Sequence, residues 1–266
     1  MCLYEYLMSL EREVFRMNVE VKRDGLILRG LLETPDTDEY DIAILMHGFT
    51  GNLGYQKTDL LDQVAKKLHE QGIATIRFDF NGHGKSDGQF QDMTVLNEIA
   101  DGSAILTFTR NLPHVRKIYL IGHSQGGVVA SMLAGYYPEY ISKLALLAPA
   151  ATLKEDAQKG DLQGTAYNPN QIPDVLPIKK GLMVGGFYLR TAQTLPIYEV
   201  AQQYTGPVCL IHGDADTVVN KKASERYHQV YQNSELHIVE GGSHRFEDKA
   251  RKQALQAVTD FFKNSN

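Results

Sequence analysis

A serine flanked by glycines follows an apolar segment near the middle of the chain. Residues 122–126 read Gly-His-Ser-Gln-Gly and fit the pattern G-x-S-x-G, in which a nucleophilic serine lies on a strained turn between a strand and a helix. The segment 117–122 is typical of a short buried strand, and the small and apolar residues 127–134 are typical of a helix. Ser124 would then hold its hydroxyl clear of the backbone, since glycines leave room for a tight turn. The alternative is a glycine-rich turn whose serine has no chemical role.

A serine hydroxyl attacks well only when a base lies within hydrogen-bond reach and a third group orients that base. Where the G-x-S-x-G turn carries such a set, an aspartate or glutamate and then a histidine follow the serine along the chain. His244 is the predicted base, because it stands in a Gly-Gly-Ser-His loop directly after the last expected strand. Asp216 is the predicted acid, because the spacing His-Gly-x-x-Asp-x-Val carries its carboxylate past a strand end, and Asp214 is the alternative. His212, at the end of that strand, is expected to brace the loop.

Two backbone N–H groups are expected to bind the oxyanion that forms when the serine attacks a carbonyl group. One belongs to Gln125, the residue after the nucleophile, and the other to Phe49 in the loop that follows the strand 42–46. We expect no metal site, because the two cysteines are far apart in sequence and no His-Glu-x-x-His spacing occurs. Acyl transfer to a serine is expected to require no cofactor. Cys209 lies in an apolar strand and is interpreted as a small core residue.

The elements around these residues must bring them together, and the apolar pattern indicates strands that alternate with helices. The first pair is a hairpin over residues 19–34, with Asp24-Gly25 at its turn. Apolar runs typical of buried strands follow at 42–46, 74–80, 143–148, 207–212 and 235–239. Helices are expected at 56–70, 94–110, 221–231 and 249–263. The pattern predicts an α/β fold with a mostly parallel sheet covered on both faces, and the loops at the carboxyl ends of its strands would hold the functional residues.

One connection is too long for a simple crossover. Residues 151–206 separate two expected strands, whereas a parallel crossover needs only about a dozen residues. The aromatic residues of this segment argue for packing rather than disorder, so we predict an inserted cap. The cap belongs to a domain predicted to cover residues 17–266. Residues 1–16 are apolar but contain Glu5 and lack a basic leader, and they are interpreted either as a short docked helix or as a start assigned too early.

Composition narrows the classes of function. The chain has 266 residues, of which 43% are hydrophobic and 22% are charged, as is ordinary for a globular protein. A net charge of −5 supplies no basic patch for nucleic acid or an anionic membrane, and no apolar run approaches membrane length. We therefore expect a cytoplasmic protein without a nucleic-acid or membrane partner.

The motifs together resemble a known family. The chain resembles the α/β-hydrolase family at His47-Gly-Phe, over residues 77–87, at the turn 122–127 and at the sequence His-Gly-Asp-Ala-Asp of residues 212–216. More narrowly, four segments resemble the bacterial cinnamoyl (feruloyl) esterases, and these are residues 126–153, 185–192, 196–200 and 224–228. Members of that subgroup are serine esterases that release ferulic, caffeic or p-coumaric acid from plant cell-wall or chlorogenic-type esters.

The resemblance implies the α/β-hydrolase fold and a serine carboxylesterase that needs no cofactor. It implies Ser124, Asp216 and His244 as the catalytic triad and a phenolic ester as the small-molecule partner. It also implies that three cap residues meet the ring hydroxyls of the acyl group, and these are Asp156, Gln163 and Tyr188. The sequence leaves open whether the chain forms a homodimer.

Two other functions are compatible with the same motifs. A lipase or acylglycerol hydrolase would use the same scaffold, but its cap would be lined by leucine, valine and phenylalanine, whereas this cap mixes tyrosines with polar residues. A binding module for a phenolic ligand would need no serine, aspartate and histidine in hydrolase order, so the intact set argues against it. Release of p-nitrophenol from a generic ester separates enzyme from binder.

Overall fold

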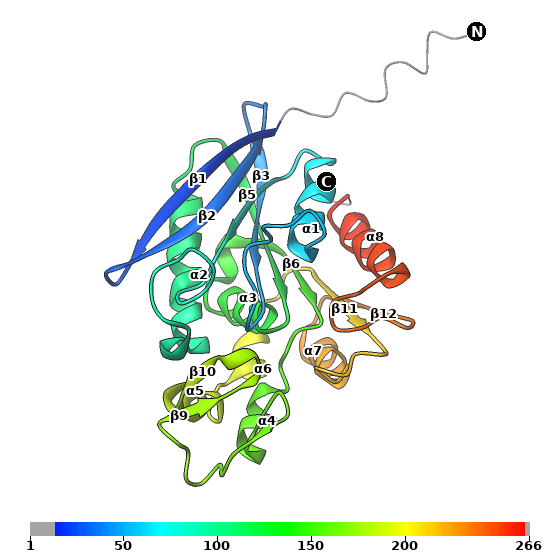
Figure 1. Ribbon diagram of the computed structural model, residues 1–266. Coiled ribbons are helices and arrows are strands. Elements are labelled where there is room, and N and C mark those ends of the chain that lie inside the picture. Colours follow the sequence, from blue (N-terminus) through cyan, green and yellow to red (C-terminus); the bar gives the residue numbers. More distant parts are fainter. Residues whose placement is uncertain (1–13, 264–266) are drawn as a thin grey trace, which may run out of the picture.

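The computed structural model describes residues 14–263 of the chain. One mixed sheet of eight strands runs through the molecule, and helices cover both of its faces (Figure 1). In chain order the strands are β1 (Val14–Arg23), β2 (Leu26–Pro35), β3 (Tyr40–Met46), β4 (Ala74–Phe78), β5 (Val115–His123), β6 (Ile141–Leu147), β11 (Val208–Gly213) and β12 (Ser234–Val239). Their order in the sheet is β1-β2-β4-β3-β5-β6-β11-β12, and neighbours from β4 to β12 are parallel. The prediction of an α/β fold with a mostly parallel sheet is confirmed.

The antiparallel part of the sheet is the predicted hairpin at its beginning. β1 pairs with β2 along the full length of both strands, and β2 pairs with β4 in antiparallel fashion. Asp24 and Gly25 form the turn with φ of 49° and 83°, the left-handed conformation that two-residue hairpins require. Val14 pairs with Pro35, so the sheet begins before the predicted domain boundary at residue 17. Of the extension interpreted as residues 1–16, residues 14–16 belong to β1, and residues 1–13 lie outside the described residues.

The apolar strands are explained by cores on both sides of the sheet. α1 (Leu60–His69) and α8 (Lys249–Lys263) cover one face, and α2 (Val95–Arg110), α3 (Gln125–Tyr136) and α7 (Lys222–Val230) cover the other. In β3, Ile42 and Ile44 pack toward α2 and α3, whereas Ala43 and Leu45 pack toward α1 and α8. A strand buried on both faces has no polar side, so its sequence is apolar throughout. None of the helices in residues 14–263 has the length and apolar character needed to cross a bilayer.

The chain between β6 and β11 folds into short elements at one end of the sheet (Figure 1). They are α4 (Leu153–Lys159), β7 (Asp161–Leu162), β8 (Thr165–Ala166), β9 (Val175–Pro177), β10 (Met183–Gly185), α5 (Gly186–Ala192) and α6 (Ile197–Ala201). A 3₁₀ turn at Lys179–Gly181 lies within this segment, and two others, Phe90–Asp92 and Pro138–Tyr140, lie outside it. Tyr188, Tyr198 and Tyr204 of this segment are buried. The segment is therefore packed against the rest of the fold, as its aromatic content predicts.

Candidate active site

Ser124 lies on the turn between β5 and α3 with its hydroxyl beside the predicted partners. Its φ of 57° and ψ of −124° are a strained conformation for a residue with a side chain, and it is 5% exposed. The turn is possible because the neighbouring residues are glycines. A Cβ on Gly126 would lie 2.3 Å from the carbonyl oxygen of His47, and one on Gly122 would lie 2.2 Å from that of Gly126. The sequence pattern thus corresponds to the expected strand–turn–helix geometry.

The three residues predicted to act together form one chain of hydrogen bonds. His244 Nε2 lies 2.9 Å from Ser124 Oγ, and His244 Nδ1 lies 2.7 Å from Asp216 Oδ2. Ser124 follows β5, Asp216 follows β11 and His244 follows β12, so all three stand at the carboxyl edge of the sheet. This geometry allows His244 to take a proton from the serine while Asp216 holds the opposite ring nitrogen.

Asp216 is held as a carboxylate by its surroundings. Burial alone would raise its pKa, but hydrogen bonds from His212 and His244 and from the Val219 N–H lower the pKa well below the ordinary value. Its Oδ1 accepts the N–H groups of Val218 and Val219 at 2.8 and 2.9 Å. The loop after β11 therefore holds Oδ1, and Oδ2 faces His244 and His212.

The alternative acid has a different role. Asp214 Oδ1 accepts the N–H of Gly241 at 2.7 Å and so ties the loop after β11 to the loop after β12. His212 braces the same loop, as expected, with Nε2 3.0 Å from the Val219 carbonyl oxygen and Nδ1 2.7 Å from Ser224 Oγ. The structure thus brings Asp216, and not Asp214, to His244.

His123, the residue before the nucleophile, positions His244, a role that the sequence did not predict. His123 Nε2 donates to the backbone carbonyl of His244 at 2.9 Å, and the two rings lie 5.0 Å apart. Burial, and then the neighbouring His244, lower the pKa of His123 to about 3, so its ring is neutral. The only sequence signal was its place between Gly122 and Ser124, and the distance of 121 positions to His244 hid the contact.

The two predicted oxyanion donors flank the serine. Gly48 places the loop after β3 against the turn, since a Cβ there would lie 2.8 Å from Ser124 Cβ. His83 Nε2 donates to the Phe49 carbonyl at 2.6 Å and fixes the orientation of that loop. No side chain or carbonyl group of residues 14–263 accepts a hydrogen bond from the N–H of Phe49 or of Gln125. Both N–H groups are thus available to an oxyanion.

His47 joins the loop after β3, which carries Phe49, to the chain just after β4. Its Nδ1 donates to the Gly48 carbonyl at 2.8 Å, and its Nε2 accepts the N–H of Phe80 at 3.1 Å. Burial, and then the neighbouring His83, lower the pKa of His47 to about 3. The ring is therefore neutral and has one donor and one acceptor nitrogen, which match these two contacts.

Of the three predicted cap residues, Tyr188 lies at the turn and the other two do not contact it. The Tyr188 hydroxyl donates to Gln125 Oε1 at 2.7 Å, and its ring centroid lies 5.5 Å from that of Phe49. Asp156 is half-buried on α4, and burial raises the pKa of its carboxyl group. Gln163 is exposed at the tip of the β7–β8 hairpin, with φ of 51°. Of these three residues, Tyr188 is therefore the one hydrogen-bonded to the nucleophile turn within residues 14–263, and Asp156 and Gln163 lie on α4 and on the β7–β8 hairpin.

Comparison with known proteins identifies the family. The family model described as Serine hydrolase (FSH1) matches residues 118–254, and the one described as Serine aminopeptidase, S33 matches residues 40–171. A solved structure of Est1E from Butyrivibrio proteoclasticus with ferulic acid bound is 34% identical, has a TM-score of 0.88 and covers 92% of this chain and 98% of that chain. The chain belongs to the α/β-hydrolase family.

Other relatives of this α/β-hydrolase are also hydrolases by name. Monoacylglycerol lipase of Mycolicibacterium smegmatis is 23% identical over 86% of this chain and 90% of the lipase. The serine hydrolase BPHL of Homo sapiens is 25% identical over 84% of this chain and 81% of that protein. The chain is thus a serine hydrolase of the α/β-hydrolase family.

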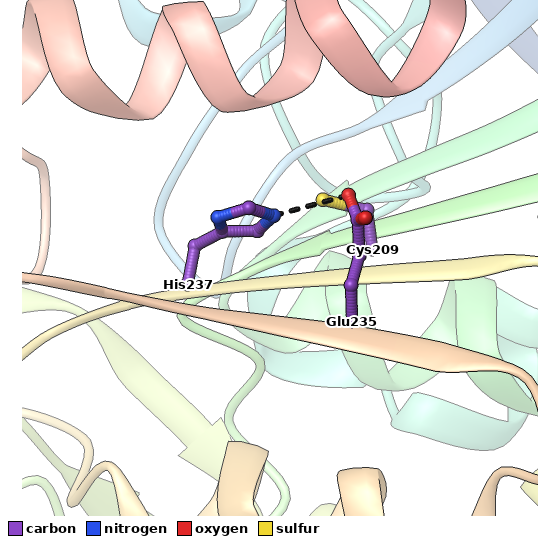
Figure 2. Close-up of side chains that lie close together, drawn as sticks. All are labelled: Cys209, Glu235 and His237. Atoms are coloured by element: carbon purple, nitrogen blue, oxygen red, sulfur yellow. Dashed lines mark hydrogen bonds and ion pairs between the residues drawn. The ribbon is translucent and has the colours of Figure 1, made fainter. Parts of the chain in front are cut away.

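Away from the triad of this hydrolase, three potential metal ligands meet on β11 and β12 (Figure 2). The ligand atoms of Cys209, Glu235 and His237 lie within 4.8 Å of one another, and His237 Nε2 is 3.0 Å from Glu235 Oε1. Strand pairing places Cys209 opposite Glu235, a proximity that their sequence spacing did not reveal. Burial, and then the Glu235 carboxylate, raise the pKa of the Cys209 thiol, and a protonated thiol does not bind metal. The absence of a metal site stays a prediction.

Proposed function

We propose that this serine hydrolase is a carboxylesterase that cleaves esters of hydroxycinnamic acids, such as ferulate, caffeate and p-coumarate, through an acyl-enzyme. The observation that carries the proposal is the hydrogen-bond chain from Ser124 through His244 to Asp216. Beside it lie two N–H groups that donate to no acceptor within residues 14–263, and the aromatic ring of Tyr188 from the cap. The likeness to Est1E, whose structure has ferulic acid bound, supports the choice of acyl group.

Acylation begins with a proton transfer along the chain. His244 Nε2 accepts the proton of Ser124 Oγ, and Oγ attacks the carbonyl carbon of the ester. Asp216 accepts the Nδ1–H of the resulting imidazolium at 2.7 Å and stabilises its charge. The N–H groups of Phe49 and Gln125 donate to the tetrahedral oxyanion, which carries the charge that develops in the transition state.

The tetrahedral intermediate then collapses and expels the alcohol. His244 Nε2 returns its proton to the leaving alkoxide, which leaves an ester between Ser124 Oγ and the cinnamoyl carbonyl carbon. A water molecule loses a proton to His244 and attacks that carbon, and the same two N–H groups bind the second oxyanion. Ser124 recovers its proton as the free carboxylic acid departs. The three side chains and the two N–H groups serve every step, so the proposed reaction calls for no cofactor.

The proposed acyl site suits a flat ring. The Phe49 ring lies 5.3 Å from Phe90 and 5.5 Å from Tyr188, so aromatic walls stand next to the oxyanion loop. Such walls bind a planar acyl group, and polar groups on the cap recognise its hydroxyls. Tyr188 contacts the nucleophile turn, and Tyr188, Asp156 and Gln163 are proposed to contact the ring hydroxyls.

A second candidate substrate is an acylglycerol, because the monoacylglycerol lipase of Mycolicibacterium smegmatis aligns with 86% of this chain. A substrate panel decides between the two. We expect a higher kcat/KM for methyl ferulate, methyl caffeate and methyl p-coumarate than for monoacylglycerols or long-chain p-nitrophenyl esters. The reverse order would favour the acylglycerol hydrolase, and turnover of no ester at all would refute both.

A further inference from the structure

Three buried side chains link the body of the hydrolase, its nucleophile turn and its cap. The Gln125 amide lies 2.7 Å from Glu98 Oε2 at one end and 2.7 Å from the Tyr188 hydroxyl oxygen at the other. Glu98 belongs to α2, Gln125 begins α3 next to the nucleophile, and Tyr188 belongs to α5 of the cap. The three residues are 1%, 2% and 4% exposed, so water does not compete for these hydrogen bonds.

The surroundings of Glu98 favour the neutral form of its carboxyl group. Burial, together with the nearby carboxyl group of Asp101, raises its pKa well above the ordinary value and outweighs the hydrogen bond from Gln125. No lysine or arginine among residues 14–263 pairs with it, and a buried carboxylate with a single hydrogen bond would be very unfavourable. A neutral carboxyl group carries a proton that needs an acceptor.

The place of that proton fixes the direction of the hydrogen bonds. Glu98 Oε1 is buried and has no hydrogen-bond partner within residues 14–263, so a proton there would be an unpaired donor. A proton on Oε2 points at Gln125 and requires the amide oxygen to face Glu98. A half-turn of the amide exchanges its oxygen and nitrogen at the same two places. The NH₂ group then donates to the Tyr188 oxygen, and the hydroxyl hydrogen of Tyr188 becomes free for another acceptor.

We propose that Glu98, Gln125 and Tyr188 form a directional hydrogen-bond relay that makes the Tyr188 hydroxyl a donor to the ring oxygen of a bound hydroxycinnamoyl group. Glu98 is then a positioning residue that sets acyl specificity through Gln125, and this inference rests on the proposed function. The relay also holds the side chain of Gln125, whose backbone N–H is a proposed oxyanion donor. Cap and nucleophile turn are thereby positioned as one unit.

The test compares two substrates that differ by one ring hydroxyl, methyl p-coumarate and methyl cinnamate. Tyr188→Phe should lower the ratio of their kcat/KM values roughly five- to a hundredfold, as expected for one lost buried hydrogen bond. Glu98→Leu should lower the same ratio by the same factor, and the double variant should lower it no further, because both changes remove one interaction. Glu98→Gln should keep the ratio within about twofold of the wild-type value, since an amide also donates to Gln125.

Asp41→Leu is the matched control for loss of a buried acid. Asp41 is 8% exposed and accepts the Tyr119 hydroxyl at 2.7 Å, but it lies at the start of β3, away from the turn. For Asp41→Leu, the ratio of the kcat/KM values for the two esters should equal the wild-type ratio even if the variant is less stable. The relay is wrong if Glu98→Leu lowers kcat/KM for both esters equally, or if Glu98→Gln loses the ratio as fully as Glu98→Leu.

An infrared difference spectrum of wild type minus Glu98→Gln tests the relay without turnover and serves if Glu98→Leu does not fold. The absorption of a protonated carboxyl group at neutral pH should be present in the wild type and lost in Glu98→Gln, and its absence from the wild type overturns the relay. Hydrolysis of p-nitrophenyl acetate distinguishes failure of the proposed function from failure of the relay. A wild type that hydrolyses this ester but neither cinnamate refutes the proposed acyl specificity, whereas the infrared result reports on the relay alone.

Discussion

Replacing Asp216 by asparagine tests the hydrogen-bond chain, because the two side chains have nearly the same shape. Oδ1 of Asp216 accepts the N–H groups of Val218 and Val219 at 2.8 and 2.9 Å. Oδ2 faces His244 Nδ1 at 2.7 Å and His212 Nε2 at 3.2 Å. An asparagine that keeps its oxygen on the two backbone N–H groups must therefore turn its NH₂ group toward both histidines.

An NH₂ group does not accept such hydrogen bonds, so His244 Nδ1 must lose its proton and become the acceptor. The ring proton then resides on Nε2, which donates to Ser124 Oγ and can no longer take its proton. The opposite amide orientation would leave two backbone N–H donors facing an NH₂ group, at about 1–3 kcal/mol each. We expect kcat to fall on the order of 10⁴-fold, the size of the loss for this replacement in a serine protease triad.

The assay measures kcat for p-nitrophenyl acetate with Asp214→Asn as the matched control. Asp214 accepts the Gly241 N–H through one oxygen, an interaction that asparagine keeps, so its kcat should stay within about twofold of the wild-type value. The reasoning is refuted if Asp216→Asn retains more than about a tenth of wild-type kcat. It is also refuted if Asp214→Asn is the more damaged variant.

Gly48→Ala should lower kcat about a hundredfold, because its Cβ would lie 2.8 Å from Ser124 Cβ and displace the oxyanion loop; an unchanged kcat would contradict this placement. Burial lowers the pKa of His47 from 6.5 to about 3, so below pH 6.5 the unfolded chain binds a proton that the folded chain does not. The free energy of unfolding should therefore decrease as the pH is lowered from 6.5 toward 3, by up to about 1.4 kcal/mol per pH unit for this group. Urea titrations of His47→Gln should show a correspondingly smaller dependence of this free energy on pH. Asp156→Ala and Gln163→Ala should lower kcat/KM for methyl caffeate but not for p-nitrophenyl acetate, and equal losses would assign them to the fold.

Local sequence patterns predicted the elements and the nucleophile turn. The apolar run at 42–46 marks a strand buried on both faces, and the Gly-x-Ser-x-Gly spacing marks a turn that only glycines permit. The helix expected at 56–70 begins instead at Leu60. The reason is local, because the Asp59 carboxylate accepts the N–H of Gln56 and the Asp59 N–H donates to the Gln56 carbonyl, which closes a separate turn before the helix.

Contacts between distant segments were beyond the reach of sequence pattern. Glu98 occupies a helix position that α3 and the cap bury, and nothing in the α2 sequence indicates which polar residue will face them. His83 and His123 each support a loop by donating to a carbonyl group far along the chain. Such roles depend on how strands order themselves in the sheet, whereas residue periodicity reports only which side of an element is apolar.

The most direct test of the proposed mechanism is to locate the acyl group on the protein. The hydrolase is mixed with p-nitrophenyl ferulate, quenched in acid within the first turnover and digested for peptide mass spectrometry. We predict a rapid release of about one equivalent of p-nitrophenol and a feruloyl group on Ser124, with neither in Ser124→Ala. A feruloyl group on a different residue, or turnover by Ser124→Ala at the wild-type rate, would contradict the account.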